Sequence, residues 1–272
     1  MRYIDLSVPV ANQAIYEPWK PEIHYLTHEG EGLDWVKGTF GVTEKDLVLS
    51  DGKGAAFEEI KLLTHAGTHV DAPWHYGPTS EGKKARTIDE CPLEWFYGNG
   101  VVLDLRHKQP NEIISIADLQ QALARINYQL QPLDIVLLMS GRDKFLHSIE
   151  YYDQPGMGYD STLWLVNQGI KLIGVDMYGF DRKFSDMAEE FRRTGDGRVV
   201  WEAHFAGIQQ EYCQIEKLAN LDQIPHPHGF KVSCFPINIQ GASAGWCRAV
   251  AIVDDAGEAT EQHGASADEM SG

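Results

Sequence analysis

The chain has few basic residues for its acidic content. Lysine and arginine together number 23, against 40 aspartates and glutamates, so the formal net charge is -17 over 272 residues. A surface of this sign repels phosphate backbones and anionic lipid headgroups. The densest basic stretches, Lys83-Lys84-Ala85-Arg86 and Arg192-Arg193, are short and lie beside acidic residues. We therefore expect no nucleic-acid and no membrane partner, and we interpret these stretches as solvated surface.

Cysteines and long apolar runs are also scarce. The four cysteines, Cys91, Cys213, Cys234 and Cys247, show no Cys-x-x-Cys spacing. This excludes a thiolate zinc site and a disulfide framework and favours reduced thiols. No window approaches the length of a transmembrane helix, and the first residues, MRYIDLSVPV, lack the apolar stretch of a signal peptide. The expected location is the cytoplasm.

Three common catalytic signatures are missing. The chain contains neither the Gly-x-Gly-x-x-Gly fingerprint nor the Walker loop, which argues against a nucleotide cofactor. Ser140-Gly141 follows an apolar run but lacks the Gly-x-Ser-x-Gly elbow, so no serine nucleophile is expected.

What remains is an ordinary globular composition, with 43% hydrophobic and 23% charged residues. Periodicity predicts strands alternating with helices, and therefore an α/β or α+β architecture with a mixed sheet. The expected strands are residues 3–10, 56–63, 101–105, 135–139, 171–176, 230–239 and 248–253. The expected helices are residues 116–126, with Ser115 as N-cap, and residues 161–167, which end before Gly169. Residues 201–219 are expected to begin as a helix and to become a strand near 213–215.

The simplest organisation is one domain over residues 1–253. Residues 12–54 are rich in Gly, Pro, Trp and charge without clear periodicity, so we interpret them as a long functional arm. Residues 254–272 are acidic and bear Gly and Ser, and we expect this tail to be disordered.

The chemistry is concentrated between His65 and His75. The stretch HAGTHVDAPWH holds three imidazoles and one carboxylate within eleven residues. Imidazole nitrogen and carboxylate oxygen suit zinc, manganese or iron(II), and three protein ligands with one open position are what a catalytic metal needs. Gly67 and Pro73 interrupt any helix, while His69 and Asp71, two apart, would point to the same side of an extended segment. The density of ligands favours a metal site over isolated structural histidines.

Every fixed position of the pattern HxGTHxDxPxH is matched here, by His65, Gly67, Thr68, His69, Asp71, Pro73 and His75. The pattern resembles the signature of the cyclase family, which includes bacterial kynurenine formamidases and isatin hydrolases. The resemblance extends from Asp5-Leu6-Ser7 to the late GASAGWCRAVA segment. It implies a compact α/β fold of the swivelling β/β/α type, a metal-dependent hydrolase, and assembly as a homodimer or homotetramer.

The resemblance also implies roles for single residues. His65, His69 and Asp71 would bind the first metal, Zn²⁺ or Mn²⁺, and His75 would donate and accept protons. In members with two ions, Asp71 bridges to a second one, which is held by a later histidine and by a glutamate twelve residues beyond it. His204 and Glu216 stand at that spacing. In a member with one ion, both would orient water or ligands instead, so one or two ions stay open.

The expected reaction is hydrolysis of an amide or lactam C–N bond in a small, aromatic molecule. The aromatic residues of the arm favour such a substrate. The resemblance implies Trp19 as the candidate substrate contact, with Trp35 as its alternative, and a packing role is the other interpretation of either residue. A lactone or ester hydrolase of the same family remains an alternative. So does a non-catalytic paralogue whose ion is structural, because a structural site closes its coordination with protein atoms.

Overall fold

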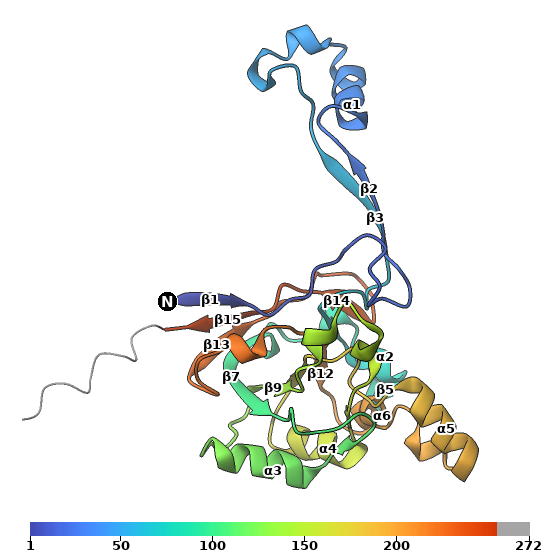
Figure 1. Cartoon of the computed structure of the whole chain (residues 1–272), viewed down its shortest axis with the longest axis vertical. Coiled ribbons are helices and arrows are strands. Elements are labelled where there is room, and N and C mark those ends of the chain that lie inside the picture. The colour runs from blue at the N-terminus through green and yellow to red at the C-terminus, as the bar shows by residue number, and fades with distance from the viewer. Residues whose placement is uncertain (255–272) are drawn as a thin grey trace, which may run out of the picture.

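One mixed sheet of nine strands organises residues 1–254, the part of the chain that the computed structural model describes (Figure 1). Its strands are β1 Arg2–Asp5, β4 His69–Asp71, β7 Tyr97–Asp104, β9 Ile135–Met139, β11 Leu172–Val175, β12 Cys213–Glu216, β13 Phe230–Ser233, β14 Ala244–Trp246 and β15 Val250–Val253. From one edge to the other they run β1-β15-β13-β7-β9-β11-β12-β4-β14. The α/β class and the mixed sheet predicted from the sequence are confirmed.

The centre of the sheet is parallel and its flanks are antiparallel. Strands β7, β9, β11 and β12 pair in parallel, whereas β12, β4 and β14 pair in antiparallel fashion. All five residues of β9 are buried, as expected for a parallel strand that is covered on both faces. Along β9, Val136 and Leu138 join one core cluster, whereas Ile135 and Leu137 join the other. This two-residue alternation gives the domain a core on each side of the sheet.

Helices cover one side of the sheet, below it in Figure 1. The α-helices within residues 1–254 are α1 Glu31–Phe40, α2 Pro73–Tyr76, α3 Ile116–Arg125, α4 Tyr159–Asn167, α5 Phe184–Thr194 and α6 Glu202–Gln209. Leu119 of α3, Leu165 of α4 and Ala203 of α6 pack into the cluster that contains Val136 and Leu138. Ser115 caps α3 as predicted, because its hydroxyl accepts from the Asp118 N–H and the Asp118 carboxylate bonds back.

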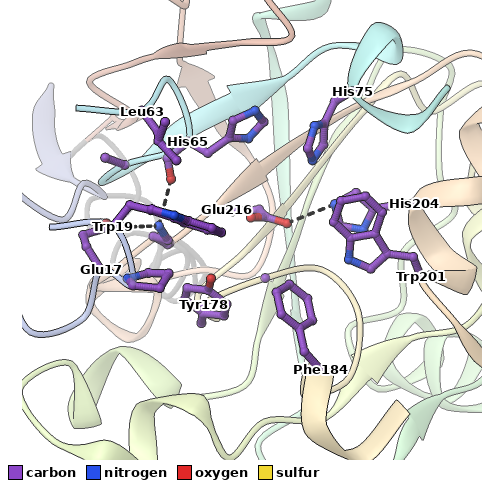
Figure 2. A pocket seen from close by; sticks show the side chains of 14 residues that line it. Glu17, Trp19, Leu63, His65, His75, Tyr178, Phe184, Trp201, His204 and Glu216 are labelled. Atoms are coloured by element: carbon purple, nitrogen blue, oxygen red, sulfur yellow. Dashed lines mark hydrogen bonds and ion pairs between the residues drawn. The ribbon is translucent and has the colours of Figure 1, made fainter. Parts of the chain in front are cut away.

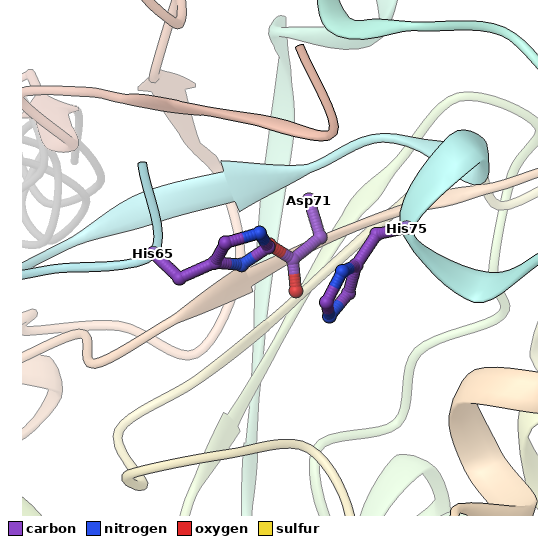
Figure 3. Close-up of side chains that lie close together, drawn as sticks. All are labelled: His65, Asp71 and His75. Atoms are coloured by element: carbon purple, nitrogen blue, oxygen red, sulfur yellow. The ribbon is translucent and has the colours of Figure 1, made fainter. Parts of the chain in front are cut away.

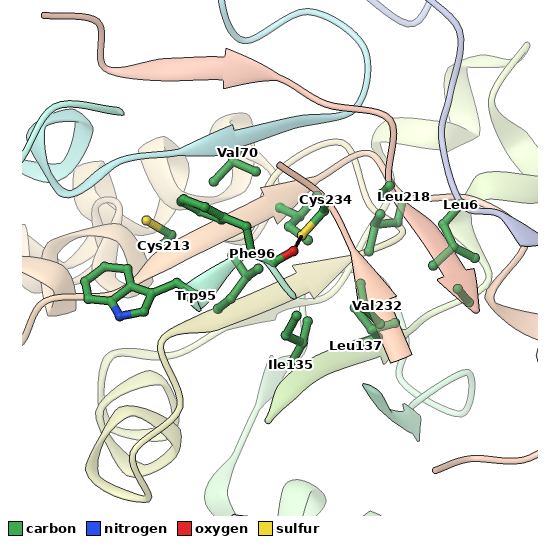
Figure 4. Close-up of a cluster of buried hydrophobic side chains, with 14 of the residues drawn as sticks. Leu6, Val70, Trp95, Phe96, Ile135, Leu137, Cys213, Leu218, Val232 and Cys234 are labelled. Carbon is green, nitrogen blue, oxygen red and sulfur yellow. Dashed lines mark hydrogen bonds between the residues drawn. The ribbon is translucent and has the colours of Figure 1, made fainter. Parts of the chain in front are cut away.

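The opposite side of the sheet holds the second cluster, drawn in Figure 4. Trp95 and Phe96, from the segment before β7, pack there with Ile135, Leu137 and Val70. Val70 is the middle residue of β4 and is completely buried. Because Val70 points into this core, its neighbours on both sides must point the other way, which sets up the site described below.

The arm contains regular structure that the sequence patterns revealed only in part. Strand β2 (Glu22–Leu26) pairs antiparallel with β3 (Phe57–Lys61), and α1 follows β2 along the chain, beyond the far end of this two-stranded ribbon (Figure 1). The ribbon stands away from the sheet in Figure 1, at the upper end of the view. Trp35 packs edge-on against Phe57, with 5.4 Å between ring centroids. The strand expected over residues 56–63 is confirmed as β3, whereas β2 and α1, which lie in the arm over residues 12–54, were not predicted. Both faces of the ribbon are largely exposed, so no buried stripe marks β2.

Other boundaries differ in detail. The first strand ends at Asp5 rather than residue 10, and the strand from Phe230 ends at Ser233 rather than residue 239. Helix α5 and the three-residue strand β14 were not predicted. Four short strands complete the strands among the described residues: β5 Thr79–Ser80, β6 Lys83–Lys84, β8 Ile113–Ile114 and β10 Gly156–Met157.

Some sequence predictions concern cysteines, membranes and the tail. All four cysteines are free, as expected. Among residues 1–254, no helix is both long enough and apolar enough to cross a membrane. Beyond Asp254, the predicted disordered tail lies outside the described residues. The division into one domain over residues 1–253 stays a prediction.

Candidate metal centre

Strand β4 places the central ligands. His69 and Asp71 lie on the face opposite Val70, and both side chains are completely buried. The neighbouring strand β12 sets Glu216 opposite His69 and Gln214 opposite Asp71. Residues directly opposite one another in a sheet share a face. Two ordinary strands therefore bring four polar side chains together.

The other two histidines flank this strand. His65 lies in the turn before β4, where Gly67 adopts a φ of +60°, a conformation that favours glycine. His75 lies on the one-turn helix α2, which begins at Pro73. His65 Nδ1 lies 2.8 Å from Asp71 Oδ1, and the rings of His65 and His75 are 4.1 Å apart between centroids. Figure 3 shows both rings beside the Asp71 carboxylate.

The ligand atoms meet the requirement of a cation site. Two groups of three have ligand atoms within 4.8 Å of one another: His65 with Asp71 and His75, and His69 with Asp71 and Glu216. Asp71 Oδ1 lies 3.2 Å from His69 Nε2 and 2.8 Å from His65 Nδ1, but neither contact is aligned as a hydrogen bond. Asp71 Oδ1 and His69 Nε2 are both buried. Leaving buried polar atoms unsatisfied costs about 1–3 kcal/mol each. A divalent ion would satisfy both, so these residues fit the metal that the sequence predicted.

Hydrogen bonds hold the imidazoles in the orientation that a ligand needs. His69 Nδ1 lies 2.8 Å from the Gly67 carbonyl oxygen, which can accept a hydrogen bond but cannot donate one. Nδ1 therefore carries the proton, and Nε2 presents its lone pair toward Asp71. His65 Nε2 lies 3.1 Å from the Ser243 hydroxyl, which leaves Nδ1 on the Asp71 side.

Electrostatics keep Asp71 ionised. Burial would raise the pKa of Asp71, but His65, His75 and His69 hold that pKa well below its usual range. Burial raises the pKa of Glu216, and the neighbouring Asp71 raises it further. Burial also lowers the pKa of His75 to about 3, although Asp71 opposes this shift. At neutral pH the described site therefore contains an ionised Asp71 and a neutral His75.

The structure brings both later candidates, His204 and Glu216, to the same place. His204 lies on α6, with its Nδ1 hydrogen-bonded to the Asp181 carboxylate. Its Nε2 lies 3.6 Å from Glu216 Oε1 and 3.9 Å from Asp71 Oδ2. Burial would lower the pKa of His204, but Asp181 raises it to about 9. Glu216 Oε2 faces His69 Nε2 at 3.7 Å.

A cavity of about 260 Å³ opens onto these residues (Figure 2). His65, His75, His204 and Glu216 line it together with aromatic side chains. The aromatic residues are Trp19, Tyr178, Phe184 and Trp201. Trp19 thus lines the pocket, whereas the alternative Trp35 lies on the arm and is not among the lining residues. A polar cluster at one side of an aromatic cavity is the usual form of a small-molecule site.

Several site residues were missed by the sequence analysis. Trp201 stacks on the ring of His204, with 4.6 Å between centroids. Asp181 orients His204, and a buried pair, Glu17 and Lys217, adjoins His65. Gln214 lies two residues before Glu216 in a strand, so the two side chains share a face of the sheet. This spacing is the one local signal that could have revealed Gln214 from the sequence.

The fold and the ligand set define a class: an α/β domain with a histidine and carboxylate metal centre beside an aromatic pocket. The sequence model of the family described as "Putative cyclase" matches residues 4–182, more than half of the chain. The chain belongs to this family. His204 and Glu216 lie beyond the matched residues, so their assignment depends on the geometry above.

Relatives agree with this membership. A kynurenine formamidase of Erythrobacter litoralis is 27% identical over 216 residues, covering 79% of this chain and 86% of the relative. An isatin hydrolase, solved with the product analogue thioisatinate, superposes with a TM-score of 0.71 at 19% identity, covering 92% of each chain. A predicted metal-dependent hydrolase from Bacillus stearothermophilus gives a TM-score of 0.57 at 20% identity, covering 92% of this chain and 97% of the other. The predicted family and its fold are confirmed.

Proposed function

We propose that this protein is a metal-dependent hydrolase that cleaves an amide or lactam C–N bond in a small aromatic molecule. One observation carries the proposal: His69 Nε2 and Asp71 Oδ1 are buried, adjacent and without hydrogen bonds, beside a cavity of molecular size. His65, His69 and Asp71 would hold the ion, with Glu216 next to them. Zinc and manganese are the candidates, because the ligands are imidazole nitrogen and carboxylate oxygen.

A divalent ion bound here would lower the pKa of water from about 15.7 to about 7 and polarise a substrate carbonyl. The protein's own contribution is proton transfer and positioning. His75 lines the cavity beside His65, so a nitrogen of its neutral ring can accept a proton from water. The resulting imidazolium returns that proton to the departing nitrogen. No covalent intermediate with the protein is required.

The substrate class is supported by the pocket and by the relatives. Trp19, Trp201 and Phe184 line the cavity and offer ring faces to a flat molecule. Relatives named kynurenine formamidase and isatin hydrolase favour a C–N bond. The cytoplasmic location expected from the sequence stays a prediction.

The test is a hydrolysis screen of N-formylkynurenine, isatin and simple lactones, with protein reconstituted with zinc or with manganese. We expect metal-dependent cleavage of an amide or lactam. Cleavage restricted to lactones or esters would favour the alternative reaction. A protein that binds the ion but hydrolyses none of these compounds would favour the non-catalytic paralogue.

We also propose that the chain assembles with copies of itself. Support comes from the arm, because the ribbon β2–β3 and α1 expose Tyr25, Trp35, Phe40 and Ile60. An isolated two-stranded ribbon is at best marginally stable in water, so these side chains favour burial against another chain. Light scattering coupled to gel filtration should give the mass of a dimer or tetramer. A monomer mass at micromolar concentration would contradict the proposal.

A further inference from the structure

Gln214 is a fully buried amide at the centre of the site. It lies on β12 opposite Asp71 and on the same face as Glu216. Its Nε2 lies 2.7 Å from His204 Nε2, 3.0 Å from Asp71 Oδ2 and 3.1 Å from Glu216 Oε1. These three partners are the ligand atoms that would hold the second ion of a two-ion site. One side-chain nitrogen is therefore within hydrogen-bonding distance of all three.

The orientation of the amide is set from its other side. The Tyr212 hydroxyl lies 3.1 Å from Gln214 Oε1 and 3.0 Å from the Ala203 carbonyl oxygen, and its single hydrogen is shared between these two acceptors. Tyr212 is itself fully buried and stacks on Tyr76, with 5.0 Å between ring centroids. The carbonyl oxygen of the amide thus faces a donor, and the NH₂ group faces the acceptors on Asp71, His204 and Glu216.

His204 is prepared to accept this hydrogen bond. Its Nδ1 is bonded to the Asp181 carboxylate, which also accepts the backbone N–H groups of Ala203 and His204. The pKa of about 9 belongs to the site without an ion. A divalent ion beside Asp71 would lower this pKa, and with the proton on Nδ1 the lone pair on Nε2 would then face Gln214. The Gln214 amide thereby occupies His204 Nε2, the nitrogen that would otherwise be available to bind a second cation.

The two halves of the centre differ in their hydrogen bonding. On one side, His69 Nε2 and Asp71 Oδ1 are buried without any hydrogen bond. On the other side, Asp71 Oδ2, His204 Nε2 and Glu216 Oε1 all lie against the Gln214 amide. The first side requires an ion to satisfy its atoms. On the second side, the two amide hydrogens of Gln214 and the Phe180 N–H, which Glu216 Oε1 accepts over 2.9 Å, suffice for the three acceptors. Two carboxylates, Asp71 and Glu216, also balance the charge of one divalent ion.

We propose that this protein holds a single divalent ion, next to His65, His69, Asp71 and Glu216, and that the Gln214 amide occupies the position of a second ion. The inference rests on the proposed function. In this arrangement His204 is a positioning residue, held between Asp181 and Gln214, rather than a metal ligand. Glu216 is divided between the two halves: Oε2 faces the ion and Oε1 accepts from Gln214.

The experiment counts bound ions. The full-length protein is freed of metal with a chelator, reloaded with zinc or with manganese, desalted and assayed for metal per chain by mass spectrometry. We expect one ion per chain for the wild type. Gln214→Glu keeps the length of the side chain and exchanges the donor for a carboxylate, so it should bind two. Gln214→Ala removes the amide and should also allow a second ion.

A matched control and a second readout make the test specific. Gln223→Glu introduces the same charge at an exposed position and should keep one ion per chain. Paramagnetic resonance of the manganese form should show an isolated ion in the wild type and a coupled pair in Gln214→Glu, because paired ions lie about 3.5–4 Å apart.

The outcomes separate this inference from the proposed function. Two tightly bound ions in the wild type would overturn it, since Gln214 would then be a ligand with its amide reversed. The inference would also be overturned if Gln214→Glu and Gln214→Ala both fold and each still binds one ion per chain. If neither variant folds, the wild-type count and spectrum decide. One ion without hydrolysis of any substrate would refute the proposed function alone, whereas no bound ion would refute both.

Discussion

A buried ion pair next to the metal centre offers the sharpest test of how the site is held together. Lys217 Nζ lies 2.7 Å from Glu17 Oε2 and 2.8 Å from the His65 carbonyl oxygen. Glu17 Oε1 in turn accepts the Gly67 N–H over 2.7 Å. The side chains of Glu17 and Lys217 are 4% and 3% exposed. The pair therefore ties the start of the arm to the turn that carries His65.

The perturbation is Lys217→Met, which keeps the length of the side chain and removes its charge and its hydrogens. Glu17 would then be a buried carboxylate without its counter-charge, and the His65 carbonyl would lose a donor. Removing one partner of a buried pair costs about 3–5 kcal/mol. At about 2–4 °C per kcal/mol for a large domain, the melting temperature should fall by about 6–20 °C.

The assay is urea and thermal unfolding, followed by circular dichroism, of wild type, Lys217→Met and the double variant Glu17→Gln/Lys217→Met. The double variant leaves no isolated charge, so it should recover part of the loss. Lys183→Met is the control, because its pair with Asp153 has side chains that are 34% and 41% exposed and should be worth less than about 1 kcal/mol. If Lys217→Met were no less stable than this control, the reasoning would be refuted.

Three further predictions concern the reaction, pH and packing. His75→Ala should abolish hydrolysis while the metal content per chain stays unchanged; retained turnover would remove His75 from the mechanism. Burial raises the pKa of Asp176 from 3.8 to about 6, so the folded state binds a proton that the unfolded state releases. This contribution to stability should therefore fall by about 3 kcal/mol as the pH rises from about 4 to about 6, and urea titrations of Asp176→Asn should lack that slope. Gly207→Ala would place a Cβ 2.1 Å from the Tyr76 ring and should cost about 1–3 kcal/mol in thermal melts, whereas Gly38→Ala, with nothing within 4 Å, should not destabilise the protein.

Much of the centre of the fold was predictable because its signals are local. The run Ile135–Met139 is uniformly apolar, and it forms a buried parallel strand with those bounds. Ser115 and Asp118 form a capping box whose partners are three residues apart. Strand β2 of the arm was not predictable by the same reasoning, since a strand exposed on both faces carries no periodic apolar pattern. Strand β14 was missed because its three residues, Ala-Gly-Trp, are too few to show one.

The sequence by itself determined the first half of the site. His65, His69, Asp71 and His75 lie within eleven residues, so short turns and one strand suffice to make them converge. Tertiary structure alone decided the second half, because the pairing of β12 with β4 sets Glu216 beside His69 and Gln214 beside Asp71. A register shift of one residue would turn both side chains away from the site. Spacing along the chain carries no information about that register, and so the role of Gln214 became visible only when the two strands lay side by side.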